Sequence, residues 1–254
     1  MNGNTTRSQE DFKIGLLTTM FAPLLPTLLQ ELIEKECNDI LIICDAKLPS
    51  EKDKKIWLER TGGEAELTME PATYIERISK YMMPFYFVES HNNHQTIDII
   101  KNNRIKVLLN AGTPRRLNNS ILSSTEYGVL NIHPGILPEY RGCTCVEWAI
   151  HNDEKVGNTA HFMNEGYDLG PILRSEYYEF PKKASYQYIR KKVYIEGCKL
   201  ASKILLEMQN RTILPTDGRK QRPEDGKYWQ PIPDSLMNEV YQKLQMSRYR
   251  YQVL

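Results

Sequence analysis

The chain has 254 residues, of which 41% are hydrophobic and 26% are charged, and its formal net charge is +1. This length accommodates one large domain with a small appendage, and the composition is that of a water-soluble globular protein. So small a charge disfavours bulk binding of nucleic acid, and no apolar run approaches the roughly 20 residues that a membrane-spanning helix needs.

The start of the chain carries no sign of a secretion signal. Residues 1–11 are polar and lack a basic flank, an apolar stretch and a cleavage site, so we expect a flexible tail. The five cysteines are odd in number and mostly lie in apolar or helical pattern, which favours reduced thiols and a cytoplasmic location. Cys143 and Cys145 are spaced more closely than the usual zinc-binding pair, so no metal is expected.

The first half of the chain alternates between strand-like apolar runs and helical patterns. We expect strands at residues 12–18, 40–44, 85–88 and 106–110, and helices at 24–36, 56–59 and 95–102. The uninterrupted apolar run at 40–44 is typical of a strand buried on both faces of a parallel sheet. Ligands of such sheets bind beyond the carboxyl ends of the strands, so the turn from Asn110 to Arg116 is a candidate ligand loop. Its Gly-Thr-Pro text is equally typical of an ordinary turn.

The second half opens with a strand at residues 128–133 that stops at a proline. The further expected elements are antiparallel strands at 158–163 and 171–176, and helices at 145–151, at 185–208 with Ser185 as N-cap, and at 235–244. After Arg211 the text becomes rich in proline, glycine and charge. We predict an α/β fold with a Rossmann-like, mostly parallel twisted sheet and flanking helices, forming a main domain at 12–212. A C-terminal extension at 213–254 then packs on this core or on a partner subunit.

Two polar side chains share one face at the end of the predicted strand 128–133. Asn131 and His133 are two residues apart, so they project in the same direction from a strand. Pro134 and Pro138 then impose an irregular loop. Taken alone, an Asn-x-His pair is more typical of a turn cap and a satisfied interior histidine, because short matches recur by chance.

The longer text around this pair is more specific. Residues 131–142 read Asn-x-His-Pro-x-x-Leu-Pro-x-Tyr-Arg-Gly, and residues 165–173 read Glu-Gly-Tyr-Asp-Leu-Gly-Pro-Ile-Leu. Together they closely resemble the signature of the folate-dependent formyltransferase family, and the resemblance extends more weakly over residues 13–211. Residues 12–212 are thereby identified as a formyltransferase catalytic domain that uses 10-formyltetrahydrofolate and forms homodimers. The sequence is most similar to the family's branch that acts on nucleotide-linked amino sugars.

The resemblance also assigns residues to the site. It places Asn131, His133 and Asp168 at the positions of the catalytic trio. It further implies that three loops surround the folate, and their residues are Gly112, Thr113, Pro114 and Arg115, then Pro134, Gly135, Ile136 and Leu137, and finally Glu165, Gly166 and Tyr167.

Physical chemistry supports the roles of the trio. Attack of an amine on a formyl carbon creates an oxyanion, and a preorganised donor there lowers the barrier by about 3 to 4 kcal/mol. Asn131 and a protonated His133 would be those donors. A lone imidazole has a pKa of about 6.5, so it needs a carboxylate nearby to stay protonated, and Asp168 is the expected partner. The same carboxylate is expected to accept the proton that the amine loses.

Three other histidines are ambiguous. His161 lies on the expected strand 158–163, where it either supports the site from behind or packs in the core. His91 and His94 have spacing compatible with one metal on a helix, but no other ligand is close in sequence, so we expect a solvated loop.

The formyl acceptor is approached by elimination. Residues 18–25 lack the glycine- and serine-rich phosphate turn of the glycinamide ribonucleotide enzymes. The extension is shorter than the added domain of methionyl-tRNA formyltransferases, and residues 1–11 cannot supply a deformylase's regulatory domain. The remaining acceptor is the primary amine of a nucleotide-activated deoxyamino sugar, with Tyr167, Tyr228 or Trp229 as candidate stacking surfaces, although packing is their commoner role. The alternatives are another small amine, hydrolysis of the folate by water, and a folate or nucleotide sensor without activity.

Overall fold

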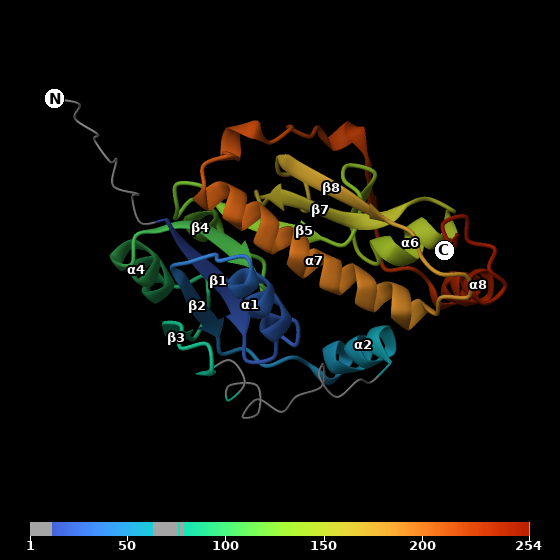
Figure 1. Cartoon of the computed structure of the whole chain (residues 1–254), viewed down its shortest axis with the longest axis horizontal. Helices are drawn as coiled ribbons and strands as arrows, with labels where there is room; N and C mark the ends of the chain where they lie inside the picture. The colour runs from blue at the N-terminus through green and yellow to red at the C-terminus, as the bar shows by residue number, and fades with distance from the viewer. Residues whose placement is uncertain (1–11, 63–75, 77–78, 254) are drawn as a thin grey trace.

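The computed structural model describes residues 12–62, 76 and 79–253, so the expected tail at 1–11 lies outside the described residues. The described chain forms a seven-stranded sheet flanked by helices, which confirms the predicted α/β class (Figure 1). Its strands are β1 (Lys13–Thr19), β2 (Ile40–Asp45), β3 (Phe85–Val88), β4 (Ile105–Asn110), β5 (Val129–His133), β7 (Val156–Phe162) and β8 (Ile172–Tyr178). The helices are α1 (Leu25–Glu34), α2 (Glu51–Thr61), α4 (His94–Asn102), α5 (Asn119–Leu122), α6 (Cys145–His151), α7 (Tyr186–Gln209) and α8 (Asp234–Gln245).

The strand order creates a crevice where the site lies. In the order β3-β2-β1-β4-β5-β7-β8, the strands from β3 to β5 are parallel, whereas β7 pairs antiparallel with β5 and β8. The antiparallel pairing of the last two strands was predicted and is confirmed, for example by the register Thr159 to Ser175. The chain runs from β1 outward to β3 and then crosses back to β4 beside β1. Loops beyond β1 and β4 therefore diverge, which leaves room for a ligand at their carboxyl ends.

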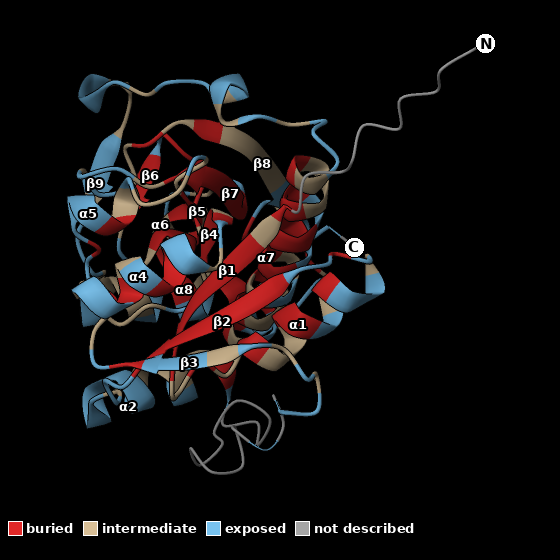
Figure 2. Ribbon diagram, turned by 90° about the vertical axis from the view of Figure 1, so that its left-hand side faces the viewer, coloured by how far each residue is buried: buried red, intermediate tan, exposed pale blue. Residues whose placement is uncertain are grey.

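Burial on both faces explains the uninterrupted apolar strands. Ile42 packs in the cluster that α1 and α7 cover, whereas its neighbours Leu41 and Ile43 pack in the cluster beneath α4 and α5. Side chains alternate across a strand, so a sheet covered on both sides needs apolar residues at every position. In Figure 2, β1 and β2 are buried along most of their length, while the edge strand β3 is largely exposed.

Helix ends follow local capping rules. The side chain of Ser185 accepts a hydrogen bond from the backbone N–H of Tyr188, so the predicted N-cap of α7 is confirmed. α2 is longer than the helix expected at 56–59, because a reciprocal cap between Ser50 and Asp53 starts it earlier. Most residues of α2 are charged, so its sequence shows little of the apolar spacing by which a helix is predicted. No helix in the described residues is both long and apolar enough to cross a membrane.

The C-terminal segment lies against its own chain. The short strand β9 (Lys227–Trp229) pairs in parallel with β6 (Tyr140–Gly142), directly after the Asn131-to-Pro138 text. α8 packs on α6 at one end of the molecule, and Val240 and Leu244 join a separate apolar cluster there (Figure 1). The C-terminal segment therefore contacts the part of the chain that follows the loop after β5.

Candidate functional site

Asn131 and His133 lie at the carboxyl end of β5, and their cross-strand neighbours belong to β7. The register places Asn131 opposite His161 and His133 opposite Thr159. Side chains directly opposite one another in an antiparallel pair are close enough to interact. β7 thus supplies a second histidine to the site, which the sequence left undecided between support and packing.

Asp168 faces both histidines from the loop between β7 and β8. Its Oδ2 lies 3.5 Å from Nδ1 of His133, and its Oδ1 lies 3.7 Å from Nε2 of His161. The backbone N–H of Gly142 donates to the same Oδ2 at 2.8 Å. Asp168 has a left-handed backbone conformation, with φ of 53°, which aspartate tolerates better than most residues. The structure therefore brings together the three residues expected to form the catalytic trio.

The hydrogen bonds of His133 define which ring nitrogen can exchange a proton. Its Nε2 lies 2.7 Å from the carbonyl oxygen of Tyr140, which can only accept, so Nε2 carries a hydrogen. Nδ1 is then the nitrogen that faces Asp168. The ring is only 4% exposed. A Cβ at Gly135 would lie 2.6 Å from Nε2, so glycine at this position lets the loop close over the ring.

His161 is a hydrogen-bond acceptor for Asn131. Nδ2 of Asn131 lies 3.0 Å from Nε2 of His161, and Nδ1 of His161 lies 3.0 Å from the carbonyl oxygen of Phe162. The carbonyl can only accept, so Nδ1 carries the proton and Nε2 accepts from the amide. Burial, followed by the nearby His133, lowers the pKa of His161 to about 4, which agrees with a neutral ring.

The C-terminal segment holds the loop of Asp168. Nε2 of Gln221 donates to the backbone carbonyls of Asp168 and Gly170, at 3.1 and 2.6 Å. Its Oε1 accepts from Nε and Nη2 of the buried Arg141, at 3.2 and 3.0 Å. Arg141 also donates to the carbonyls of Arg222 and Pro223. Gln221 therefore joins the Asp168 loop to the chain that follows β5.

We expect Gln221→Ala to lower kcat about tenfold while the protein stays folded. The reason is the loss of two hydrogen bonds to backbone carbonyls, which fix the position of the Asp168 loop relative to His133. Steady-state kinetics and thermal unfolding measure the two effects. Gln30→Ala removes an exposed glutamine whose side chain donates to Glu34, far from the Asp168 loop, and serves as control. An unchanged kcat in Gln221→Ala would mean that the loop keeps its geometry without the clamp.

The residues expected to surround the folate lie in different environments. Gly112 and Pro134 line a cavity beside Asn131, and Thr113 and Pro114 line an adjoining hollow. Glu165, Gly166 and Tyr167 lie on the loop before Asp168, where Arg116 donates to the Glu165 carbonyl and covers the Tyr167 ring. Ile136 and Leu137 are buried, and Arg115 forms an ion pair with the buried Asp45 at 2.7 Å. Gly135 packs on His133, as described above.

The expectation of a solvated loop at His91 is wrong. Its side chain is fully buried, and its ring nitrogens lie 2.8 Å from Oγ1 of Thr113 and 3.0 Å from the carbonyl of Ile43. His91 and the Asp45–Arg115 pair thus hold the turn after β4 in place, through contacts to Thr113 and Arg115. The described residues contain no group of three or more potential metal ligands.

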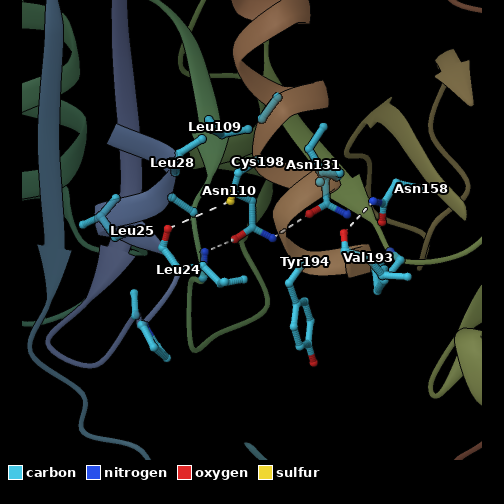
Figure 3. Close-up of a pocket in the computed structure, with 18 of the residues that line it drawn as sticks. Leu24, Leu25, Leu28, Leu109, Asn110, Asn131, Asn158, Val193, Tyr194 and Cys198 are labelled. Atoms are coloured by element: carbon cyan, nitrogen blue, oxygen red, sulfur yellow. Dashed lines mark hydrogen bonds between the residues drawn. The ribbon is translucent and has the colours of Figure 1, made fainter. Parts of the chain in front are cut away.

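A cavity of about 320 Å³ opens beside Asn131, at the carboxyl ends of β1, β4 and β5 (Figure 3). This size is within the range of small-molecule sites. Its lining is mostly apolar, with aromatic side chains from three elements, Phe21, Trp57 and Tyr194. Sequence reasoning missed these three, and only the lone tryptophan in the charged α2 could have signalled them.

The aromatic residues singled out from the sequence lie elsewhere. Trp229 stacks on Tyr140 with ring centroids 5.5 Å apart and also contacts Trp148, so it packs the C-terminal segment against the core. Tyr167 and Tyr228 are exposed, with centroids 6.0 Å apart. None of the three lines the cavity beside Asn131.

At the switch point of this sheet, a histidine, an amide and a carboxylate meet beside a cavity, an arrangement that suits group-transfer chemistry. The sequence matches the formyl transferase family over residues 30–205, and the chain belongs to that family. A methionyl-tRNA formyltransferase of Caldanaerobacter subterraneus subsp. tengcongensis is 29% identical over 160 residues, which are 63% of this chain and 50% of that protein. The chain therefore spans about half the length of this relative.

Solved structures share the fold. Glycinamide ribonucleotide transformylase 1 from Symbiobacterium toebii superposes with a TM-score of 0.61 at 17% identity, covering 84% of this chain and 98% of that one. A sugar N-formyltransferase from a Shewanella species gives a TM-score of 0.59 at 19% identity, with coverage of 87% and 78%. At such identities the likeness concerns the fold alone.

Proposed function

We propose that this chain transfers a formyl group from 10-formyltetrahydrofolate to the primary amine of a nucleotide-activated deoxyamino sugar. The observation that carries the proposal is the cavity beside Asn131, whose walls are mostly apolar and include three aromatic side chains. Membership of the formyl transferase family supports the reaction. The choice of acceptor rests on the cavity.

The trio can carry the reaction in two steps. The amine nitrogen attacks the formyl carbon, and the carbonyl oxygen becomes an oxyanion that Asn131 and His133 stabilise by donating hydrogen bonds. His133 donates from a protonated Nδ1, because its Nε2–H is taken by the Tyr140 carbonyl. The proton lost by the amine passes to Asp168, directly or through a water. The bond between the formyl carbon and the folate nitrogen then breaks, and that nitrogen leaves with a proton. No step requires a metal.

The loop after β1 argues against a phosphoribosyl acceptor. Phosphate sites in such folds use several free backbone N–H groups at a helix start. Here the N–H of Phe21 donates to Oγ1 of Thr19 and that of Leu25 donates to the carbonyl of Ala22, while Pro23 has none. Pro23 and Pro26 thus leave the start of α1 with fewer free backbone donors than such a phosphate site uses.

The aromatic wall suits the apolar face of a deoxy sugar. Trp57 and Tyr194 stack with ring centroids 5.0 Å apart and 27° between their planes. Aromatic rings bury C–H faces well and can add one polar contact. We infer that the accessible faces of these two rings contact the sugar of the bound acceptor.

We expect Trp57→Leu to raise the KM for the acceptor amine about three- to tenfold and to leave the KM for the folate unchanged, since the aromatic wall is lost while an apolar side chain remains. Trp148→Leu is the matched control, because its indole contacts Trp229 and donates to the Gln230 carbonyl, away from the cavity. Initial rates with each substrate varied in turn measure both constants. An equal rise in both KM values would place Trp57 outside the acceptor site.

An acceptor panel tests the proposal itself. The chain is incubated with 10-formyltetrahydrofolate and nucleotide-linked amino sugars, glycinamide ribonucleotide or methionyl-tRNA, and products are read by mass spectrometry. Formylation of an amino sugar is the expected result. Turnover with glycinamide ribonucleotide alone would refute the choice of acceptor, and tetrahydrofolate release without any amine would make the chain a hydrolase. Binding of folate without turnover of any kind would leave a sensor.

Methionyl-tRNA is the second candidate. The relative from Caldanaerobacter is named for that activity, and an apolar wall also accommodates a methionine side chain. The two acceptors differ in charge, because tRNA binding depends steeply on salt whereas binding of a nucleotide sugar does so weakly. A salt titration of KM therefore separates them. We also propose that the protein is cytoplasmic and forms a homodimer. Light scattering on the purified chain measures its molar mass and so tests the homodimer.

A further inference from the structure

Asn110 lies between the turn after β4 and the amide of Asn131, at the first position of the candidate ligand loop that ends at Arg116. Its Oδ1 accepts hydrogen bonds from the backbone N–H groups of Gly112 and Thr113, at 3.2 and 2.9 Å. Its Nδ2 donates to Oδ1 of Asn131 at 2.8 Å, a bond drawn in Figure 3. Both asparagines line the cavity.

These bonds extend into a chain that ends at a backbone group on each side. From Asn110 it passes to Asn131, whose Nδ2 donates to Nε2 of His161 at 3.0 Å. Nδ1 of His161 then donates to the carbonyl of Phe162 at 3.0 Å. The backbone N–H groups at one end can only donate, and the carbonyl at the other end can only accept. Both ends therefore require the same donor and acceptor atoms in each side-chain amide and in the imidazole ring between them.

The direction decides which atom of Asn131 is available to a ligand. Its oxygen is occupied by Asn110, and one of its two N–H bonds is occupied by His161. Within the described part of the chain no further acceptor takes the second N–H. If the amide were turned over, an oxygen would stand where this donor is needed, and it would repel an oxyanion instead of stabilising it.

We propose that Asn110 is a positioning residue for formyl transfer, which orients the amide of Asn131 so that one N–H stays free for the oxyanion. The proposal rests on the proposed function, because it takes Asn131 as the donor. It also connects the turn at Gly112, expected to contact the folate, to the reacting centre. A change in that turn would therefore reach the catalytic amide through one side chain.

Asn110→Asp tests the direction with almost no change in shape. The introduced carboxylate still accepts from Gly112 and Thr113, but it can only accept, so two oxygens would face each other across the bond to Asn131. The repulsion is relieved when the Asn131 amide turns over and donates to the carboxylate. His161 then faces an oxygen and must carry its proton on Nε2.

The expected result has two parts. kcat falls about 10²- to 10³-fold, the cost of losing one oxyanion donor, with both KM values nearly unchanged. Nitrogen NMR of the histidine rings, recorded without any substrate, shows the proton of His161 moved from Nδ1 to Nε2. Asn110→Ala, which removes both bonds, gives a smaller loss of kcat and a mixed ring signal, and thermal unfolding verifies that each variant is folded.

Asn158→Asp is the control for the NMR signal. Asn158 lines the same cavity, but its Nδ2 donates to the carbonyl of Val193 and the hydroxyl of Tyr178, outside the chain of bonds. The His161 signal should stay as in the wild type. Wild-type kcat in Asn110→Asp overturns the proposal, and so does a loss of kcat with an unchanged His161 signal. A reversed signal in a protein that formylates no amine supports the direction of the bonds and refutes the proposed function instead.

Discussion

Replacing His133 with alanine is expected to lower kcat for formyl transfer by on the order of 10³-fold, with little change in either KM. The ring is held between the Tyr140 carbonyl and Asp168, and its Nδ1 lies 3.5 Å from the carboxylate that is to receive the proton. Its removal takes away a donor to the oxyanion and the partner of Asp168. Asn131→Ala and Asp168→Ala are expected to abolish transfer in the same way while preserving the fold. Single-turnover kinetics with 10-formyltetrahydrofolate measure the chemical step.

Two comparisons sharpen this test. If His133 and Asp168 act on one proton path, the double variant loses no more activity than the worse single variant, since residues that act as a unit are strongly non-additive. His151→Ala removes a partly exposed histidine that lies 3.2 Å from Glu239, away from the site, and should keep wild-type kcat. A fully active His133→Ala enzyme would refute the mechanism.

Glu147→Ala is expected to lower the free energy of unfolding by about 3 to 5 kcal/mol, because it leaves a buried arginine without its counter-charge. Glu147 and Arg190 are 1% and 2% exposed, and Nη1 of Arg190 lies 3.6 Å from Oε2 of Glu147. The hydroxyl of Tyr186 donates to Oε1 of the same carboxylate at 2.5 Å. Denaturant unfolding followed by circular dichroism measures the loss.

The control for this variant is an exposed pair. Glu196→Ala breaks the ion pair with Lys199 on α7, and is expected to change stability by less than about 1 kcal/mol. Joint replacement of Glu147 by leucine and Arg190 by methionine should cost less than Glu147→Ala, because the fully buried charge of Arg190 is removed and only the partly exposed Arg60 loses its partner. A Glu147→Ala protein as stable as the wild type would show that water reaches Arg190.

The same pair gives stability a pH dependence. Burial disfavours the charge on Glu147, but Arg190 and Arg60 outweigh it and hold the pKa of the carboxyl below its usual value. A lowered folded-state pKa stabilises the protein above the unfolded value of about 4.3, and the stabilisation is lost as the pH falls through the lowered pKa. This ion pair also reaches the cavity, since Arg190 donates to the hydroxyl of Tyr194, which stacks on Trp57.

The sequence by itself determined the fold class, most of the elements and the shared face of Asn131 and His133, whereas Asp168 was assigned to the same site through the resemblance to the formyltransferase family. Apolar runs such as Ile40 to Cys44 are typical of a strand covered on both faces, and the spacing of Asn131 and His133 places both on one side of a strand. Ser185 begins its helix through a bond to a residue three positions on. Each of these features depends on neighbours along the chain, so the sequence is enough to predict it.

Only the tertiary structure decided what surrounds the trio. β7 lies beside β5 and places His161 against Asn131, while β4 brings Asn110 to the other side of the same amide. Trp57 and Tyr194 are far apart in the chain, and they meet as a cavity wall because α2 packs on α7. Gln221 reaches the Asp168 loop from the C-terminal extension, a contact that the sequence did not predict. These contacts join distant parts of the chain, and no local periodicity or propensity encodes which distant side chains will meet.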